Sequence, residues 1–359
     1  MTAPPASAPS EVAWFSALCD DDYRWLGVGD PTLRSSFEHC ADIVTTAERA
    51  GFDNVLLPSG YDLGIDSVAF GGGVARMTDR IRMLVAVRCG ELWPPQLARQ
   101  LATLDQMLHG RLTINIISSD LPGAPMASEP RYARSGEVMA ILRTMLRGDR
   151  LDHHGEHYDL TLEPPRVARD AADARGGEAP PFYFGGLSEP ARDTAAEHAD
   201  VFLMWPDEIA GLTATIDDMT SRAHAHGRAL RFGYRVHVVV RETESAARAA
   251  AFELVSRLEP EVGESIRLRS LDSSSVGVAR QADLRDRADA DGFVEANLWT
   301  GIGRARSGCG AAIVGDPDQV VAKLREYEAL GISSFILSGY PHREECELVA
   351  RHVLPALRG

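Results

Sequence analysis

The sequence has few cationic residues, few cysteines and no long uninterrupted apolar run. Its 359 residues include 37 Lys and Arg against 52 Asp and Glu, which gives a formal net charge of −15. An acidic chain repels nucleic acid and anionic membrane surfaces, so an anionic ligand would need a local cationic pocket. The apolar runs are too short and too interrupted to span a bilayer. We therefore expect no nucleic-acid partner and no membrane segment.

The cysteines argue against a disulfide framework and against a thiolate metal site. The sequence has five, an odd number. They are widely scattered, at Cys19, Cys40, Cys89, Cys309 and Cys346. No pair has metal-ligand spacing, which favours a reducing, cytoplasmic environment. Residues 1–10 are rich in Ala, Pro and Ser and lack a signal pattern, so we expect a flexible tail before a single domain over 11–359.

A recurring pattern of helix, glycine and apolar strand predicts the fold. Gly51, Gly110, Gly227 and Gly331 each end a helical segment, and an apolar strand follows directly. The expected strands are Val12–Leu18, Val55–Pro58, Arg82–Val87, Leu112–Ile117, Phe182–Phe184, Val201–Met204, Arg231–Arg241 and Phe335–Leu337. Continuous hydrophobicity is typical of parallel strands buried on both faces. The pattern favours an α/β fold, a closed (β/α)₈ TIM barrel. An open doubly wound sheet is the alternative, but no Gly-x-Gly-x-x-Gly follows the first strand.

Two polar segments lie outside a minimal barrel. The first, about 149–175, is predicted to form a hairpin and an irregular excursion. Its His153, His154 and His157 have a metal-like spacing, but without a supporting carboxylate pattern we expect solvated histidines and no metal. The second and larger insertion spans about 261–308, between the seventh strand and the last helix–strand unit. Such excursions tend to be lids or binding loops.

The seventh strand carries Arg235 and His237 within an apolar run. Period-two geometry places both side chains on one face of the strand. A buried Arg is costly unless an anion or a partner meets it. The face therefore either carries a structural ion pair or lines a polar cavity.

Other candidate residues lie where barrel strands end, which is where active sites form in this architecture. Gly185, Gly186, Leu187 and Ser188 open a helix, so they form either an anion site or an ordinary capped turn. The buried amide of Asn115 needs a ligand or a neighbouring backbone group. The remaining candidates are Trp205 as core or pocket wall, Arg306 in a glycine-rich loop, and Tyr340 and His342 after the last strand. No Gly-x-Ser-x-Gly elbow supports a serine triad.

Three separated motifs resemble one known family. Arg231–Thr243, Leu337–His342 and Pro181–Gly186 resemble the bacterial luciferase-like flavin monooxygenases, most of all the two-component alkanesulfonate monooxygenases. The resemblance extends from Trp14 to Pro355. It implies a TIM barrel that uses reduced FMN (FMNH₂) and O₂ to oxidise a small organic substrate. It also implies a separate NAD(P)H:flavin reductase, a mobile loop, and a homodimer or homotetramer.

The same resemblance implies roles for individual residues. The expected flavin ligands are Asn115, Tyr132, Gly185, Gly186, Leu187 and Ser188, with Tyr132 and Ser188 at the phosphate. The expected pocket for the substrate and the oxygenated flavin is lined by Trp205, Arg235, His237, Arg306, Tyr340 and His342. Arg235 and Arg306 would supply the positive charge that the chain as a whole lacks. His237 would act either as a base or as an orienting group.

The sequence departs from the sulfonate enzymes at the expected mouth of the barrel. Those enzymes carry a cysteine shortly after the second strand, whereas residues 58–66 contain none. The first strand exits through Ser16–Cys19 and the third through Cys89 and Gly90. Two alternatives therefore stand beside an alkanesulfonate substrate. One is oxidative cleavage of an aromatic molecule such as riboflavin, and the other is a flavin-binding protein without turnover.

Overall fold

The computed structural model describes residues 10–358 except 169, 271–274 and 307. Residues 1–9 of the expected tail lie outside this part. Eight parallel strands close on themselves, because β9 pairs with both β8 and β13. The barrel strands are β1 (Glu11–Phe15), β2 (Asn54–Leu57), β3 (Arg82–Arg88), β4 (Leu112–Ile117), β7 (Phe182–Phe184), β8 (Val201–Met204), β9 (Arg231–Val240) and β13 (Ile332–Ser338). The predicted (β/α)₈ barrel is confirmed.

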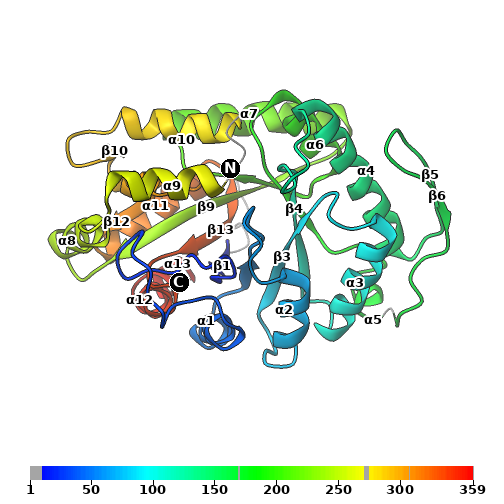
Figure 1. Ribbon diagram of the computed structural model, residues 1–359, viewed down its shortest axis with the longest axis horizontal. Coiled ribbons are helices and arrows are strands. Elements are labelled where there is room, and N and C mark those ends of the chain that lie inside the picture. The colour runs from blue at the N-terminus through cyan, green and yellow to red at the C-terminus, as the bar shows by residue number, and fades with distance from the viewer. Residues whose placement is uncertain (1–9, 169, 271–274, 307, 359) are drawn as a thin grey trace, which may run out of the picture.

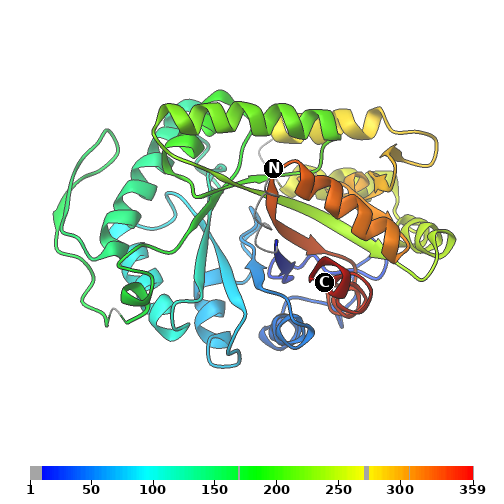
Figure 2. The ribbon, with the colours of Figure 1, turned by 180° about the vertical axis from the view of Figure 1, so that it is seen from behind.

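Helices surround the barrel (Figures 1 and 2). They are α1 (Phe37–Ala50), α2 (Ser67–Val74), α3 (Pro94–Met107), α4 (Ser128–Arg147), α6 (Glu189–His198), α7 (Ile209–Ala225), α11 (Pro317–Ala329), α12 (His342–His352) and α13 (Leu354–Arg358). Each of the four glycines expected to end a helix has a left-handed backbone, with φ between 66° and 96°. α1 begins after Ser36, whose side chain accepts the His39 N–H at 3.1 Å.

A buried polar network closes the N-terminal end of the barrel. Glu11 accepts hydrogen bonds from Tyr183 at 2.8 Å, Ser334 at 3.2 Å and Asn54 at 3.3 Å. An apolar layer that includes Phe15 packs above it inside the barrel. Polar side chains beyond this layer therefore face the C-terminal ends of the strands, where the site was expected.

The first insertion contains a hairpin, as predicted. Strands β5 (Leu151–His154) and β6 (Asp159–Leu162) pair antiparallel, and α5 (Asp170–Ala174) follows. The histidines are not simply solvated, because His153 Nε2 lies 3.1 Å from Glu137 Oε2 and His154 Nδ1 lies 2.6 Å from Asp159 Oδ1. In the described part of the chain, no group of three or more His, Cys, Asp or Glu could hold a metal ion.

The second insertion is longer than the predicted 261–308 and returns to the sheet, which the sequence did not reveal. Between β9 and α11 the chain forms α8 (Glu244–Val255), α9 (Pro260–Ser270), α10 (Val276–Asp286), β10 (Phe293–Glu295), β11 (Leu298–Trp299), the 3₁₀ turn η1 (Gly301–Arg304) and β12 (Ala312–Gly315). β9 is long enough to pair with β8 along its first half and with β12 along its second half. This pairing sets Ala312 beside His237. Figure 1 shows α8, α9 and α10 on the side of the barrel opposite the β5–β6 hairpin.

None of the helices in the described residues is long and apolar enough to cross a membrane.

Candidate active site

Arg235 and His237 point into the C-terminal end of the barrel from β9. Their exposed fractions are 4% and 1%. The Arg235 guanidinium lies 4.6 Å from the centre of the Phe15 ring, and its Nη1 donates to the carbonyl of Val236 at 3.1 Å. Among the described residues, no carboxylate forms an ion pair with Arg235. The described residues therefore give no ion pair for Arg235, and the alternative of a polar cavity stays a prediction.

His237 is a neutral ring with one nitrogen fixed and one unpartnered. Its Nδ1 lies 2.7 Å from Ser338 Oγ, because Ser338 is its register partner on β13. Its Nε2 is buried without a hydrogen-bond partner among the described residues. Burial, Arg235 and Arg306 together hold the pKa of His237 well below its ordinary value. The ring therefore stays uncharged at neutral pH.

Arg306 reaches the site from the glycine-rich loop after η1. Its Nη1 donates to Asp21 Oδ2 at 2.9 Å and to the Tyr340 hydroxyl at 2.8 Å. Burial acts to lower the pKa of Arg306, but Tyr340 and Asp21 outweigh it and raise that pKa. The Tyr340 ring stacks on His237, with centroids 5.2 Å apart. The loop therefore contributes a fixed positive charge beside the His237 ring.

His342 lies behind Tyr340 at the start of α12. It is fully buried, and neither ring nitrogen has a hydrogen-bond partner among the described residues. Burial lowers the pKa of His342, although Asp22 and Asp21 oppose the shift. Its backbone N–H donates to Asp22 Oδ1 at 2.9 Å, and its carbonyl accepts from Trp14 at 3.0 Å. The backbone is thus held, and the ring packs against Phe15 and Tyr340 with both nitrogens unpartnered among the described residues.

Most of the residues predicted for the substrate pocket come together in the structure. We call this group the mouth cluster; its members are Arg235, His237, Arg306, Tyr340 and His342. Trp205 lies one residue beyond β8 and contacts the insertion instead. A Cβ placed on Gly277 of α10 would lie 3.1 Å from its Cζ3 atom. The start of α10 therefore packs on this indole.

The residues predicted for the flavin lie on the other side of the barrel mouth. Asn115 is half-buried on β4, in register with Ala86 of β3 and Tyr183 of β7. Tyr132 lies against the turn after β7, because a Cβ on Gly186 would lie 3.2 Å from its hydroxyl oxygen. Gly186 has a φ of 155°, and the same Cβ would meet Ala191 at 2.7 Å. The turn therefore requires glycine at this position.

The turn before α6 fits a phosphate group better than it fits an ordinary cap. Ser188 occupies the N-cap position, yet its side chain makes no capping hydrogen bond. Its Oγ is buried and has no partner among the described residues. A phosphate there would meet the Ser188 and Tyr132 hydroxyls and the free N–H groups of the helix end. Glycine is required at position 185 for packing, because a Cβ there would lie 2.3 Å from the Leu203 carbonyl oxygen.

Sequence reasoning missed Arg88, at the end of β3. Its exposed fraction is 3%. It donates to Ser119 Oγ, to the Asp120 carbonyl at 3.3 Å and to the Ser59 carbonyl at 3.4 Å. Burial lowers the pKa of Arg88, and Glu91, 3.1 Å away, opposes the shift. An Arg that ends an apolar strand was the signal that could have identified it.

Sequence reasoning also missed Asp21 and Asp22, in the connection from β1 to α1. Asp21 holds Arg306, and Asp22 holds the backbone of His342. Asp22 also accepts from His39 Nε2 at 2.9 Å. Acidic residues directly after the first strand were visible, but their partners lie about three hundred positions away.

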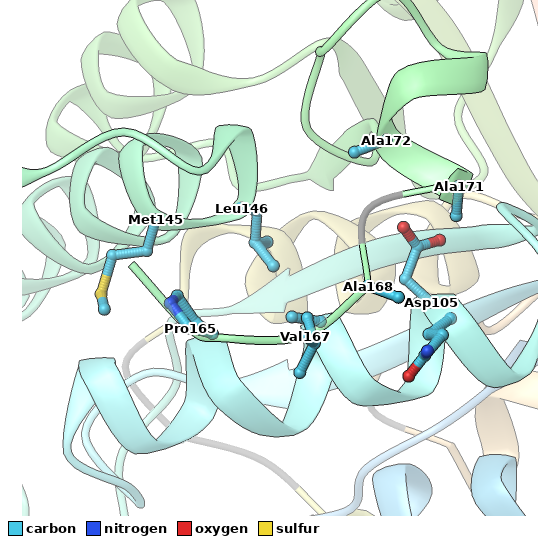
Figure 3. Close-up of a pocket in the computed structure, with 10 residues that line it drawn as sticks. Asp105, Met145, Leu146, Pro165, Val167, Ala168, Ala171 and Ala172 are labelled. Atoms are coloured by element: carbon cyan, nitrogen blue, oxygen red, sulfur yellow. The ribbon is translucent and has the colours of Figure 1, made fainter. Parts of the chain in front are cut away.

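Two cavities lie at opposite ends of the barrel. One of about 160 Å³ opens between the C-terminal ends of β2 and β3, beside Arg88. The other, of about 20 Å³, lies between the C-terminal turns of α3 and α4 and is closed by residues that include Pro165, Val167 and Ala171, beside Asp105 (Figure 3). Helix C-termini mark the N-terminal end of the barrel. The smaller cavity is thus remote from the mouth cluster, and its Asp105 is already paired with Arg175 at 2.6 Å.

The chain is similar to known proteins along nearly its whole length. The sequence model of a family described as luciferase-like monooxygenase matches residues 25–334. A sulfoquinovose monooxygenase of Novosphingobium aromaticivorans is 60% identical over 352 residues, which cover 96% of each chain. A sulfoquinovose monooxygenase of Agrobacterium fabrum is 53% identical over 352 residues, which cover 97% of this chain and 90% of that protein. A crystal structure of riboflavin lyase has a TM-score of 0.78 at 19% identity, covering 98% of this chain and 92% of the other, which shows a shared fold.

Proposed function

The chain belongs to the luciferase-like monooxygenase family and is a flavin-dependent monooxygenase, and from this premise we propose that it cleaves the carbon–sulfur bond of a sulfonate. We propose sulfoquinovose, a hexose that carries a sulfonate group, as the substrate. The support is the identity of 60% and 53% to two sulfoquinovose monooxygenases. The reaction would convert R–CH₂–SO₃⁻, O₂ and reduced FMN into an aldehyde, sulfite, water and oxidised FMN.

The buried, unpaired guanidinium of Arg235 is the observation that carries this proposal. It is 4% exposed and has no ion-pair partner among the described residues. A planar guanidinium matches the oxygens of an anion such as a sulfonate through paired N–H donors. Arg306 adds a second charge from the loop, and His342 adds ring nitrogens without partners. Although the chain as a whole is acidic, Arg235 and Arg306 bring two positive charges to the mouth of the barrel.

The chain offers positions for reduced FMN. Asn115, Tyr132 and the Gly185–Ser188 turn would hold it, with the Tyr132 and Ser188 hydroxyls at the phosphate. When bound, the reduced flavin supplies the electrons with which one O₂ atom enters the substrate and the other becomes water. A separate NAD(P)H:flavin reductase would deliver it, and the protein would assemble as a homodimer or homotetramer.

The side chains of the mouth cluster would then orient the sulfonate and manage its protons. Arg235 and Arg306 would hold the sulfonate oxygens. They would stabilise the negative charge that builds up on the departing sulfite as the carbon–sulfur bond breaks. Neutral His237, fixed through Nδ1 by Ser338, would present Nε2 either as a proton acceptor or as an orienting group. Tyr340 accepts a hydrogen bond from Arg306, so the position of the loop would set the position of the Tyr340 ring beside the substrate.

The absence of a cysteine after β2 does not leave this turn without a thiol. A Cβ placed on Gly60 would lie 3.0 Å from Cys19 Sγ, so the exit of β1 brings a thiol to the exit of β2. Cys19, in the altered exit of the first strand, thus lies beside the turn of residues 58–66, which contains no cysteine of its own. Both departures are compatible with a sulfonate substrate.

The proposed function is tested by supplying FMN, NAD(P)H and a flavin reductase in air. Sulfite release would be compared for sulfoquinovose and linear alkanesulfonates, and lumichrome formation would be measured with riboflavin. We expect sulfite, with the highest kcat/KM for sulfoquinovose. Lumichrome without sulfite would replace the proposal by riboflavin cleavage. Flavin binding without either product would replace it by a non-catalytic role.

A further inference from the structure

The larger cavity at the barrel mouth has the size and the polarity of a sugar site. Its volume is about 160 Å³, room for on the order of ten water molecules and therefore for a single sugar ring. It opens between the exits of β2 and β3. The lining residues that matter here are Ser59, Gly60, Asp66, Arg88, Glu91 and Leu92.

This cavity adjoins the mouth cluster. Gly60 lines it, and Cys19 Sγ lies 3.0 Å from where a Cβ on Gly60 would be. Burial raises the pKa of the Cys19 thiol to about 12, so the sulfur is uncharged. Two residues further along the chain, Asp21 pairs with Arg306. A substrate could therefore place its anionic end at the arginines and extend its other end into the cavity.

The charges in the cavity are arranged to hold hydroxyl groups. Arg88 is held by backbone carbonyls and Ser119, and its Nε lies 3.1 Å from Glu91 Oε1 without hydrogen-bond alignment. The Glu91 side chain keeps 37% of its surface exposed. Asp66 also faces this cavity, and its Oδ1 already accepts the Ala69 N–H at 2.6 Å. Carboxylate oxygens accept hydrogen bonds from sugar hydroxyls and repel a sulfonate.

Exposed apolar side chains lie at the cavity and next to it in the chain. Leu63 and Leu92 line the cavity and are 82% and 39% exposed. Trp93 is the next residue after Leu92 and is 54% exposed. Trp93 occupies the N-cap position of α3, where it makes no side-chain capping bond. Capping therefore gives no reason for a Trp there, since polar residues are preferred at N-caps. The negative face of an indole attracts the C–H bonds of a sugar ring.

We propose that this cavity is the subsite for the sugar ring of the substrate, with Glu91 as hydroxyl acceptor and Trp93 as stacking surface. The inference rests on the proposed function, since it names which part of a sulfonated hexose lies where. The sulfonate would face Arg235 and Arg306, and the ring hydroxyls would face Glu91. A linear alkanesulfonate offers no hydroxyl donors to Glu91, so the cavity selects the sugar over the alkyl chain.

The experiment compares Glu91→Gln and Trp93→Ala with Glu163→Gln as a matched control. Glu163 is exposed and lies just beyond β6, near the hairpin and away from the mouth. Sulfite release at varied sulfoquinovose gives kcat/KM, and 1-hexanesulfonate added as a competing ligand gives an inhibition constant. Reduced-FMN affinity is measured anaerobically by flavin fluorescence, and thermal unfolding checks the fold.

We expect each cavity variant to lose about tenfold or more in kcat/KM for sulfoquinovose, in line with the loss of a hydrogen bond to a charged group. The inhibition constant of 1-hexanesulfonate and the affinity for reduced FMN should stay within about twofold of the unmodified protein. Unchanged sulfoquinovose kinetics in both variants, with an active unmodified enzyme, would overturn the sugar subsite alone. An unmodified enzyme that releases no sulfite from sulfoquinovose would overturn the proposed function and this inference with it.

Discussion

Arg306 and Asp21 lie 285 positions apart in the sequence and form an ion pair of 2.9 Å at the mouth of the barrel. The same Arg306 nitrogen donates to the Tyr340 hydroxyl at 2.8 Å. The pair therefore ties the loop after η1 to the β1–α1 connection and to the end of β13. Any movement of this loop would therefore also shift the Tyr340 ring.

Asp21→Asn should loosen this loop. The two side chains are only 25% and 12% exposed, but asparagine keeps an oxygen that can accept from Arg306, so we expect a smaller cost than the ~3–5 kcal/mol of a broken buried pair. We expect the sulfite formed per reduced flavin consumed to fall severalfold, because an open loop admits water. Asp20→Asn is the control, since Asp20 pairs with Arg34 on the surface. Equal yields from both variants would show that the Arg306–Asp21 pair does not govern closure.

Arg235→Met should separate function from stability. An unpaired buried guanidinium costs folding energy, so an apolar side chain of similar length should leave the melting temperature unchanged or raised. Sulfite release should fall by about a hundredfold or more, in line with the loss of a charged contact in a buried site. Arg241→Met is the contrast, because Arg241 pairs with buried Glu345 at 2.7 Å and its loss should cost about 3–5 kcal/mol. A strongly destabilised Arg235→Met protein would show that Arg235 is structural.

Stability should fall in mild acid because of His237 and His342. Both have folded-state pKa values below the ordinary 6.5. Below about pH 6.5 the unfolded chain binds protons that the folded chain does not, so stability is lost as the pH falls toward the folded pKa values. Each ring contributes at most about 1.4 kcal/mol per pH unit in this window. His39, whose pKa Asp22 raises, acts in the opposite sense.

The check is denaturant unfolding from pH 7.5 to 5.5 of the unmodified protein and of His237→Gln. The variant should show a shallower loss of unfolding free energy over this range. Identical slopes would mean that His237 titrates in the folded protein as it does in the unfolded chain.

The turn before α6 should recognise the phosphate rather than the ring of the flavin. Ser188→Ala and Tyr132→Phe each remove a hydroxyl at this turn. We expect each to weaken FMN binding about tenfold and to leave riboflavin binding unchanged, because riboflavin has no phosphate. Fluorescence titration with both flavins measures this. Parallel losses for FMN and riboflavin would place the phosphate elsewhere.

The sequence predicted the barrel because its signals are local. Glycines such as Gly51 and Gly227 end helices through their own backbone conformation, and buried parallel strands are apolar throughout. The shared face of Arg235 and His237 follows from strand periodicity alone. These properties need no knowledge of distant partners.

The missed features depend on contacts between distant segments. β12 is a four-residue run that becomes a strand only because β9 extends past β8 and offers it an edge. Asp21 and Asp22 read as loop residues until the loop after η1 and the start of α12 meet them. The environment of Arg88 likewise requires the exits of β2 and β4 to be in place.

The most direct test of the account is a single turnover. The protein would be loaded anaerobically with reduced FMN and sulfoquinovose and then mixed with O₂-saturated buffer, and sulfite would be measured against flavin oxidised. The account predicts sulfite in near-equal amount to the flavin oxidised, and almost none from Arg235→Met. Complete flavin oxidation without sulfite in the unmodified protein would contradict the assignment of the mouth cluster to a sulfonate.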